Sequence, residues 1–266
     1  MLTGATSGIG AETAVRMAGM ADTLIVLGLE SEPECRAVLR RIRRGGPANV
    51  HYISVDFTHL AEVVNAARAI MTLSSVIDLL INDAALPGAP KRILTVDGFE
   101  RTLQVNAFAP ALLTGLVAPV ISTGARVVNV TSSAHRLERF DFSDIDFERQ
   151  YTPVAAYARA KLAMTTWSSS LAEERATEAI EVVALCPGLN DTPLSAAMTG
   201  GIGGPPTEGA ARVLFAATAD VPSGSYLEHD RVTPPSAEVR DTANRGRLAQ
   251  LYRDRLSPFI SSVARS

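Results

Sequence analysis

The sequence has 266 residues, of which 47% are hydrophobic and 20% charged, which fits one large α/β domain better than two small ones. Its net charge of -3 gives no electrostatic reason to expect nucleic acid or an anionic membrane surface as a partner. Cys35 and Cys186 match no metal or disulfide spacing and indicate reduced thiols. No segment approaches the roughly 18 apolar residues of a membrane span, so a cytoplasmic protein without a membrane span is expected.

A glycine-rich turn opens the chain. Only Met1 and Leu2 precede it, so the first strand is expected to be short, and a helix is expected to begin near Ala11. Glycines let a backbone approach a pyrophosphate, whose charge is met by the free amides of a helix amino terminus. A plain glycine turn is the alternative, but the position between strand and helix favours phosphate binding. The predicted binding residues are Gly4, Ser7, Gly8, Ile9 and Gly10.

Two further strands are predicted at 23–28 and 49–56, each with an acidic residue at or just past its end. Glu30 would hydrogen-bond the adenosine ribose of a dinucleotide and repel a 2′-phosphate, which favours NAD over NADP. The alternatives are that Glu30 faces water or that Arg36 reaches such a phosphate. Asp56 is placed to meet the adenine amino group, or else it caps the helix expected over 60–72.

A fourth strand is predicted at 76–82, and the small residues that follow it permit close approach beneath a coenzyme. Asn82 and Ala84 are assigned to this part of the site. A long helical region is then expected from about 98 to 121, interrupted at Pro110. Asn106, among apolar neighbours, is either a satisfied structural amide or part of a polar relay. Pro110 would leave the Asn106 carbonyl free to hold a water, which favours the relay.

The catalytic candidates lie between 126 and 161. A buried strand over 126–132 ends at Ser132, at the edge where open α/β sheets bind ligands. Tyr157 and Lys161 are four residues apart, so on a helix both lie on one face, and the ammonium favours the phenolate. This pair alone is a weak signal. His135 is interpreted as a loop side chain rather than a catalytic base.

A sixth strand is predicted at 179–186, and the residues after it are expected beside a nicotinamide ring: Pro187, Gly188 and Thr192. The segment 189–206 contains a glycine-rich stretch and is predicted to be a substrate loop or lid. A short last strand at 225–228 and a terminal helix through Tyr252 complete the chain. No internal repeat or second domain is indicated.

Together these motifs resemble the short-chain dehydrogenase/reductase family. Residues 3–10 match its Thr-Gly-x-x-x-Gly-x-Gly turn, and Asp56 matches its adenine-binding aspartate. Its catalytic tetrad corresponds to Asn106, Ser132, Tyr157 and Lys161. The long interval after Ser132, with His135 in it, is similar to the retinol-dehydrogenase-like branch, including fungal members of secondary metabolism. The sequence departs from the pattern at Glu30, Asp83 and Ala85.

The resemblance implies one doubly wound, three-layer α/β domain with a parallel sheet (Rossmann fold) over 1–266, which binds NAD(H) or NADP(H). It implies hydride transfer between nicotinamide and a carbonyl or secondary alcohol carbon, with Ser132 binding the oxygen and Tyr157 exchanging the proton. Lys161 would lower the tyrosine pKa and bind ribose hydroxyls, and Asn106 would hold a water behind it.

The expected substrate is a medium-sized, apolar alcohol or ketone, since the irregular loop 189–206 lines the pocket. A homodimer or tetramer is expected by resemblance alone. Two other functions stay open because a fold does not fix a function. One is a non-redox isomerase, dehydratase or cyclase on the same scaffold, and the other is a non-catalytic nucleotide-binding protein.

Overall fold

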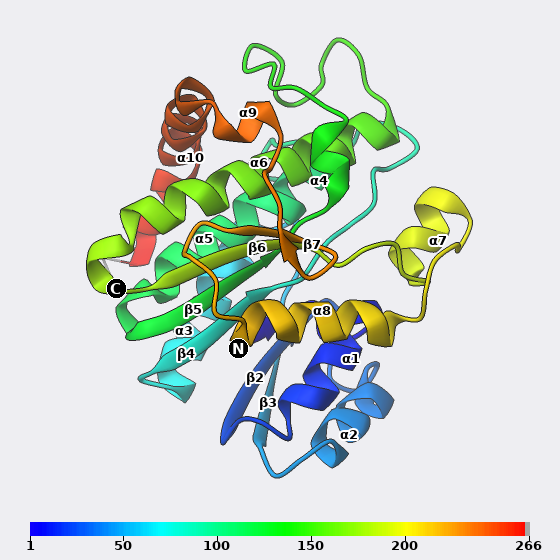
Figure 1. The fold of residues 1–266 in the computed structure, drawn as a ribbon, viewed down its shortest axis with the longest axis vertical. Helices are drawn as coiled ribbons and strands as arrows, with labels where there is room; N and C mark the ends of the chain where they lie inside the picture. Colours follow the sequence, from blue (N-terminus) through cyan, green and yellow to red (C-terminus); the bar gives the residue numbers. More distant parts are fainter. Residues whose placement is uncertain (264–266) are drawn as a thin grey trace.

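The computed structural model describes residues 1–263, with side chains through Ser261, and its strands form one sheet (Figure 1). The strand order is β3-β2-β1-β4-β5-β6-β7-β8, and all neighbours pair in parallel except β7 and β8. The strands are β1 (Leu2–Thr3), β2 (Thr23–Gly28), β3 (Asn49–Ser54), β4 (Ile77–Asn82), β5 (Ile121–Val130), β6 (Glu181–Cys186), β7 (Tyr226–Glu228) and β8 (Arg231–Val232). The predicted fold class is confirmed.

Helices cover both faces of this sheet. The longer ones are α1 (Gly8–Met17), α2 (Arg36–Arg44), α3 (Leu60–Leu73), α5 (Ala109–Val117), α6 (Pro153–Glu174), α8 (Pro206–Thr218) and α10 (Thr242–Val263). The shorter ones are α4 (Arg101–Leu103), α7 (Pro193–Thr199), α9 (Ala237–Arg240), a π-helical turn η1 (Gln104–Phe108), and 3-10 turns η2 (Ala118–Val120), η3 (Ser133–Arg136) and η4 (Ala176–Glu178).

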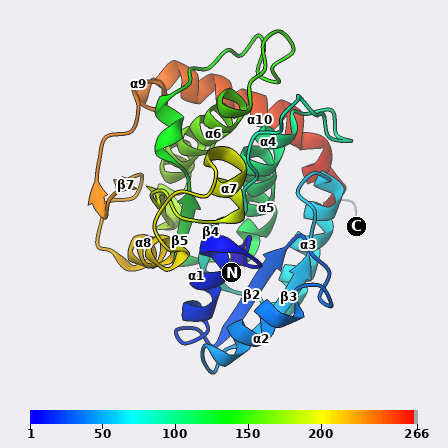
Figure 2. The same ribbon diagram turned by 90° about the vertical axis from the view of Figure 1, so that its right-hand side faces the viewer.

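Side chains that alternate along each strand pack into two separate hydrophobic cores, one on each face of the sheet. In β2, Leu24 and Val26 face a core shared with α1, α2 and α8, whereas Ile25 and Leu27 face a core shared with α3, α5 and α6. Successive strand residues point to opposite faces, so an uninterrupted apolar run such as β2 is buried on both sides. The result is three layers, with α10 packed outside α5 and α6 (Figures 1 and 2).

The central strand β1 is short, as expected. Leu2 pairs with Val26 of β2 and Ile81 of β4, and no part of Leu2 is exposed. Full burial of such a leucine contributes about 1.5–3 kcal/mol. The order of strands reverses between β1 and β4, which opens a crevice at the carboxyl edge of the sheet, where ligands bind in open α/β folds. In Figure 2, which is seen from this side, α7 faces the viewer.

The expected long helix is present but irregular. It runs through α4, η1, α5 and η2, and the Ala109 amide donates to the Gln104 carbonyl five residues earlier. Pro110 has no N–H for the Asn106 carbonyl four residues before it, and the turn widens at this point.

Contrary to the sequence-based expectation, Arg101–Val120 is apolar and long enough to pass as a membrane span by composition. Because 78% of its apolar window is buried inside the fold, this is weak evidence for one.

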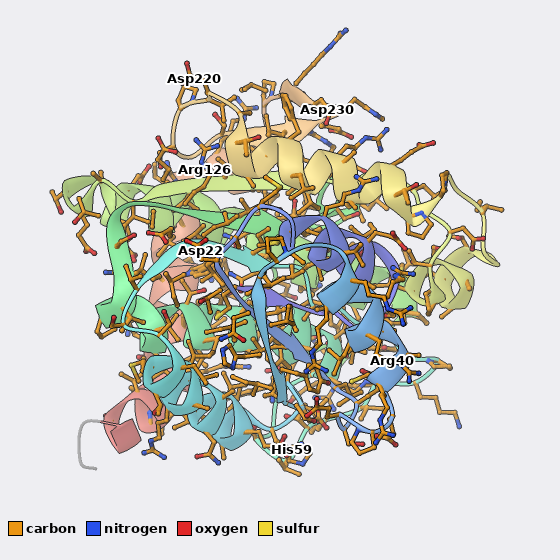
Figure 3. All side chains as sticks on the ribbon, turned by 90° about the horizontal axis from the view of Figure 1, so that it is seen from below. Asp22, Arg40, His59, Arg126, Asp220 and Asp230 are labelled. Carbon is orange, nitrogen blue, oxygen red and sulfur yellow. The ribbon has the colours of Figure 1, made fainter. Side chains whose placement is uncertain are left out.

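Charged side chains lie mostly at the periphery, where Figure 3 shows Arg40, Asp220 and Asp230 projecting outward. Arg126 is different because its side chain is only 12% exposed. It pairs with Glu181 on the neighbouring strand and donates to the carbonyls of Ala216 and Ala219 at the end of α8. A cation at a helix carboxyl terminus satisfies its free carbonyls and complements its dipole. This contact fixes α8 on the sheet.

Candidate coenzyme and catalytic site

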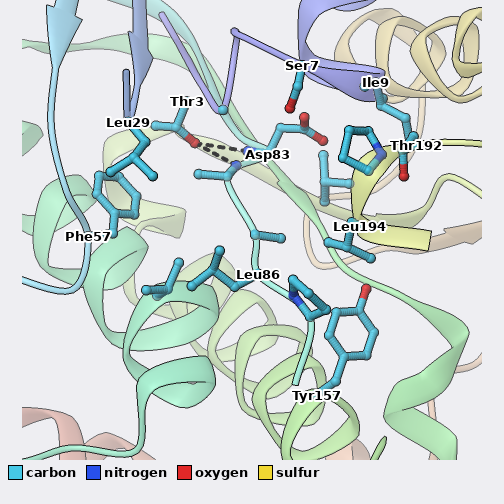
Figure 4. A pocket seen from close by; sticks show the side chains of 18 of the residues that line it. Thr3, Ser7, Ile9, Leu29, Phe57, Asp83, Leu86, Tyr157, Thr192 and Leu194 are labelled. Carbon is cyan, nitrogen blue, oxygen red and sulfur yellow. Dashed lines mark hydrogen bonds between the residues drawn. The ribbon is translucent and has the colours of Figure 1, made fainter. Parts of the chain in front are cut away.

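A cavity of about 910 Å³ follows the carboxyl edge of the sheet. Its walls come from the glycine-rich turn before α1, the segments that follow β2 to β6, the amino-terminal half of α6, and α7. Figure 4 shows Thr3, Ser7, Asp83, Leu86 and Tyr157 around this space. The fold therefore brings most of the predicted site residues into one cavity.

The glycine-rich turn forms one end of the cavity. Gly4 and Gly8 have φ values of 72° and 52°, in the left-handed region that glycine adopts without strain. A Cβ on Gly4 would lie 2.8 Å from the backbone of Ala84. Ser7 makes no side-chain cap to α1, so the first amides of this helix are available to an anion. Both glycines, Ser7, Ile9 and Ala84 line the cavity.

Gly10 is a correction to the predicted cofactor set, because it does not line the cavity. A Cβ on Gly10 would overlap the carbonyl oxygen of Gly4 and lie 2.6 Å from Oδ2 of Asp83. Its missing side chain therefore permits the close crossing of turn and helix.

Two acidic residues occupy the opposite end. Glu30 lines the cavity, and its Oε2 is buried without a hydrogen-bond partner, whereas Arg36 is exposed and outside the lining. Asp56 also lines the cavity, but its Oδ1 accepts from the Thr58 amide at 2.8 Å and its Oδ2 lies 3.3 Å from His59 Nδ1. Asp56 thus holds the turn before α3 and faces the cavity, but it does not cap this helix as the alternative proposed: the N-cap residue is His59, and the Leu60 amide donates to Asp97 Oδ2 at 2.9 Å.

Asn82 is a second correction. It is 1% exposed and outside the cavity lining, because its Nδ2 donates to Thr114 at 3.1 Å and to Asn129 at 2.9 Å. The amide joins β4 to α5 and β5 behind the cavity wall. The following segment is held by Thr3, whose hydroxyl accepts from the amides of Asp83 and Ala84 at 3.0 Å each.

Asn106 also lies outside the cavity lining and is 1% exposed. Its Oδ1 accepts from the Leu86 amide at 2.7 Å, and its Nδ2 donates to the Leu86 carbonyl at 2.9 Å. The side chain is therefore a satisfied amide that fixes the cavity wall at Leu86. The water held by its backbone carbonyl stays a prediction.

Ser132, Tyr157 and Lys161 all line the cavity, as predicted. Ser132 follows β5, and its Oγ accepts from the Ala134 amide at 3.2 Å, which orients the hydroxyl. Thr152 caps α6 by accepting from the Ala155 amide, and Tyr157 and Lys161 follow on that helix. Lys161 Nζ donates to the Val130 carbonyl at 2.9 Å and lies 5.7 Å from the centroid of the Tyr157 ring. A lysine and a tyrosine thus share one helix face beside the serine.

The ionisation of this group differs from the prediction. Burial raises the pKa of Tyr157 above its ordinary value of 10, and the Ser132 hydroxyl opposes this as a hydrogen-bond partner. Burial also lowers the pKa of Lys161 to about 8, against the attraction of Asp83. The effect of burial on Tyr157 opposes the lowering of the tyrosine pKa that was expected from Lys161. In the structure as it stands, burial favours the neutral phenol of Tyr157.

The segment after β6 closes the cavity above the glycine-rich turn. Pro187, Gly188 and Thr192 line it, and the Thr192 Cγ2 lies 3.1 Å from where a Cβ of Gly8 would be. Thr192 and Ser195 form a capping box at the start of α7. The predicted loop 189–206 is thus partly helical, and the Asp191 amide donates to the Gly204 carbonyl at 2.7 Å to close it.

Comparison with known proteins identifies the family. The model of the family described as short chain dehydrogenase matches residues 1–201. The chain is a short-chain dehydrogenase. Mouse retinol dehydrogenase 13 is 30% identical over 264 residues, which cover 91% of this chain and 78% of that protein. This relative agrees with the predicted retinol-dehydrogenase-like branch.

Two further comparisons set the extent of the likeness. Mouse polyprenol dehydrogenase is 33% identical over 178 residues, covering 64% of this chain and 52% of that protein, so this short-chain dehydrogenase spans about half of its length. A crystal structure of an uncharacterized protein from Mycobacterium Paratuberculosis superposes with a TM-score of 0.80 at 27% identity. It covers 96% of this chain and 92% of its own.

Sequence reasoning missed two side chains that hold the dehydrogenase site. His135 is fully buried, with Nδ1 2.7 Å from the Ser132 carbonyl and Nε2 accepting from the Ser236 amide at 3.1 Å. These partners require the neutral tautomer with hydrogen on Nδ1. Arg212 of α8 donates to the Pro187 carbonyl at 2.7 Å. The sequence around His135 and Arg212 does not indicate the contacts with Ser236 and Pro187, because these partners lie 101 and 25 positions away.

Apolar side chains form much of the rest of the cavity wall. They come from the loop after β4 and from the segment around α7, and they are Leu86, Ile93, Leu94, Val96, Leu189, Leu194 and Met198. Leu94, Val96 and Leu189 are exposed in addition, by 46%, 76% and 53%. An open apolar wall of this kind can hold the hydrocarbon part of a small molecule.

Proposed function

We propose that this short-chain dehydrogenase is an NAD(H)-dependent oxidoreductase that interconverts a carbonyl group and a secondary alcohol on a medium-sized apolar molecule. The observation that carries the proposal is that Ser132 and Tyr157 line the same cavity as the glycine-rich turn and the apolar side chains. One part of this cavity suits a dinucleotide and the other an apolar substrate. A role in secondary metabolism stays a prediction.

The residues present fit a dinucleotide. The turn at Gly4 and Gly8 approaches without side chains, and the free amides of α1 favour a pyrophosphate. The buried Glu30 oxygen without a partner suits the hydroxyls of an adenosine ribose. Lys161 would hold the nicotinamide ribose, and Pro187 with Thr192 would lie beside the nicotinamide. The bound coenzyme supplies or accepts the hydride.

The protein's part of the reaction is the handling of one oxygen and one proton. In the reduction direction the Ser132 hydroxyl donates a hydrogen bond to the substrate carbonyl, and the neutral phenol of Tyr157 gives the proton to the same oxygen. Burial raises the pKa of Tyr157 and so favours the neutral phenol, which holds the proton to be donated. His135 and Asn106 position the site without contacting the substrate, because His135 binds the Ser132 carbonyl and Asn106 binds the Leu86 backbone.

Glu30 supports a preference for NAD(H). A 2′-phosphate would face a buried carboxyl group there. The basic residues in the cavity lining, within residues 1–263, are His59, Arg101 and Lys161, and His59 Nδ1 already lies 3.3 Å from the Asp56 carboxylate. Lys161 belongs to the catalytic end, and Arg101 begins α4. The apolar wall supports the substrate class, and two relatives are named for alcohols, polyprenol and retinol.

The test is a titration of the purified protein with NADH and NADPH, followed by nicotinamide fluorescence. We expect NADH to bind at least about tenfold tighter, which corresponds to about 1.4 kcal/mol. Glu30→Arg should reverse the order, and Glu32→Arg, an exposed position outside the cavity, should leave it unchanged. Failure of both nucleotides to bind would refute the coenzyme site, and tighter NADPH binding by the wild type would refute the preference.

A further inference from the structure

Two hydroxyl groups of β3 hold the backbone of the loop that carries Glu30. The Tyr52 hydroxyl donates to the Glu30 carbonyl, and the Ser54 hydroxyl donates to the Leu29 carbonyl at 3.2 Å. Tyr52 and Ser54 lie two residues apart on one strand, so their side chains leave the same face of the sheet. β3 pairs in parallel with β2, with Ser54 opposite Gly28, which brings both hydroxyls to the loop that follows β2.

The Tyr52 hydroxyl lies behind the cavity wall at Gly28. A Cβ on Gly28 would be 2.9 Å from Tyr52 Oη and 3.0 Å from Thr6 Oγ1. Gly28, Thr6 and Glu30 line the cavity, whereas Tyr52 does not, and its ring packs against the core shared with α1 and α2. Tyr52 would therefore act on a ligand through the loop that it holds, without touching the ligand.

The same loop is also held at its other end. The Glu34 carboxylate accepts from the amide and the hydroxyl of Ser31 at 2.8 and 2.6 Å, and the Cys35 thiol donates to the Ser31 carbonyl at 3.3 Å. A backbone fixed on both sides of Glu30 limits where its side chain can go. This matters because Glu30 Oε2 is buried without a hydrogen-bond partner, which costs free energy that a freely moving loop would recover by turning the carboxylate to water.

Building on the proposed NAD(H) site, we propose that Tyr52 is a positioning residue for coenzyme choice: its hydroxyl holds the Glu30 backbone so that the carboxylate faces the adenosine ribose. A carboxylate fixed there accepts a hydrogen bond from the 2′-hydroxyl of NADH and repels the 2′-phosphate of NADPH. Because the carboxylate is in place before the coenzyme arrives, binding does not have to order it. The Tyr52 hydroxyl thus strengthens NADH binding and weakens NADPH binding.

Tyr52→Phe removes this hydroxyl and keeps the ring. The loss of one such hydrogen bond corresponds to a change of about three- to tenfold in a binding constant. We expect NADH to bind more weakly by about this factor and NADPH to bind as tightly as before or more tightly, so the ratio of the two dissociation constants narrows by at least about threefold. Ser54→Ala removes the neighbouring bond to Leu29 and should move the ratio in the same direction.

Both dissociation constants are measured by nicotinamide fluorescence for the wild type and each variant, with circular dichroism to show that the variants are folded. Tyr151→Phe is the matched control, because the Tyr151 hydroxyl also donates to a backbone carbonyl, that of Ala89 at 2.8 Å, and neither residue lines the cavity. It should leave the ratio unchanged. In a second measurement Tyr52→Phe is made in a Glu30→Ala protein, where it should no longer change the ratio, because the carboxylate that it positions is gone.

The outcomes separate this inference from the proposed function. If neither nucleotide binds the wild type or the variants, the coenzyme site itself is refuted. If the wild type prefers NADH and Tyr52→Phe keeps the ratio within about twofold, the role of Tyr52 is refuted and the coenzyme site stands. Equal weakening of both nucleotides, or an unchanged effect of Tyr52→Phe in the Glu30→Ala protein, would assign the hydroxyl to stability alone and also overturns the proposal. If Tyr52→Phe does not fold, the ratio for Ser54→Ala decides in the same way.

Discussion

Asn106 offers a direct test of how the wall beside Tyr157 is held. Its amide makes two hydrogen bonds to the backbone of Leu86, one donated and one accepted, in a position that is 1% exposed. Asn106→Ala removes both partners at once and leaves the N–H and the carbonyl of Leu86 unpaired.

The expected loss follows from those two groups. A buried polar group left without a partner costs about 1–3 kcal/mol. Leu86 itself is half-buried and water can reach part of its backbone, so the lower part of the range applies to each group. We expect Asn106→Ala to lower the free energy of unfolding by about 2–4 kcal/mol, and Tm by about 2–4 °C for each of these kcal/mol in a domain of this size.

Urea unfolding followed by circular dichroism measures this loss. Asn65→Ala is the control, because Asn65 is exposed on α3 and its removal should change stability by less than about 0.5 kcal/mol. Asn106→Asp keeps the acceptor for the Leu86 amide and loses the donor, so it should remain destabilised at pH 7. The reasoning is wrong if Asn106→Ala unfolds within about 0.5 kcal/mol of the wild type.

Two more predictions concern the chemistry and the supporting histidine. Tyr157→Phe removes the proton donor and should lower turnover by about 10²–10⁴ while NADH still binds, and near-wild-type turnover would contradict the role of the phenol. Burial lowers the pKa of His135, so the folded protein binds this proton less readily than the unfolded chain, and stability should fall as pH drops below the unfolded value of about 6.5. His135→Gln should lose this part of the dependence. Urea midpoints at pH 7.5 and 5.5 check it, and equal shifts in both proteins would count against the buried neutral histidine.

The sheet was largely predictable because its strands are continuous apolar runs. The expected strand at 23–28 matches β2 in both bounds, and the one at 49–56 overlaps β3 (Asn49–Ser54). Helix ends were less predictable. The first helix was expected to begin near Ala11 but begins at Gly8. The helix after β2 begins only at Arg36, because Glu34 accepts from the amide and hydroxyl of Ser31 and holds a turn there.

The candidate site was predictable where residues act through motif spacing, as for Ser132, Tyr157 and Lys161. It was not predictable where a contact across the fold decides the role. The Asn82 side chain hydrogen-bonds Thr114 and Asn129 behind the cavity wall, and the sequence near Asn82 does not indicate these partners. The ionisation of Tyr157 likewise depends on burial, which a four-residue spacing cannot report.

The π-helical turn η1 lets a single helical rod fit two different neighbours. An α-helix rotates about 100° per residue, so one extra residue within a turn rotates everything after it by about that angle relative to everything before it. Before the turn, α4 packs against α6, the helix that carries Tyr157, and after it α5 packs against α3. The extra residue therefore turns the apolar side chains from one neighbouring helix to the other: those before η1 face α6, and those after it face α3. Asn106 lies within η1, where the direction changes.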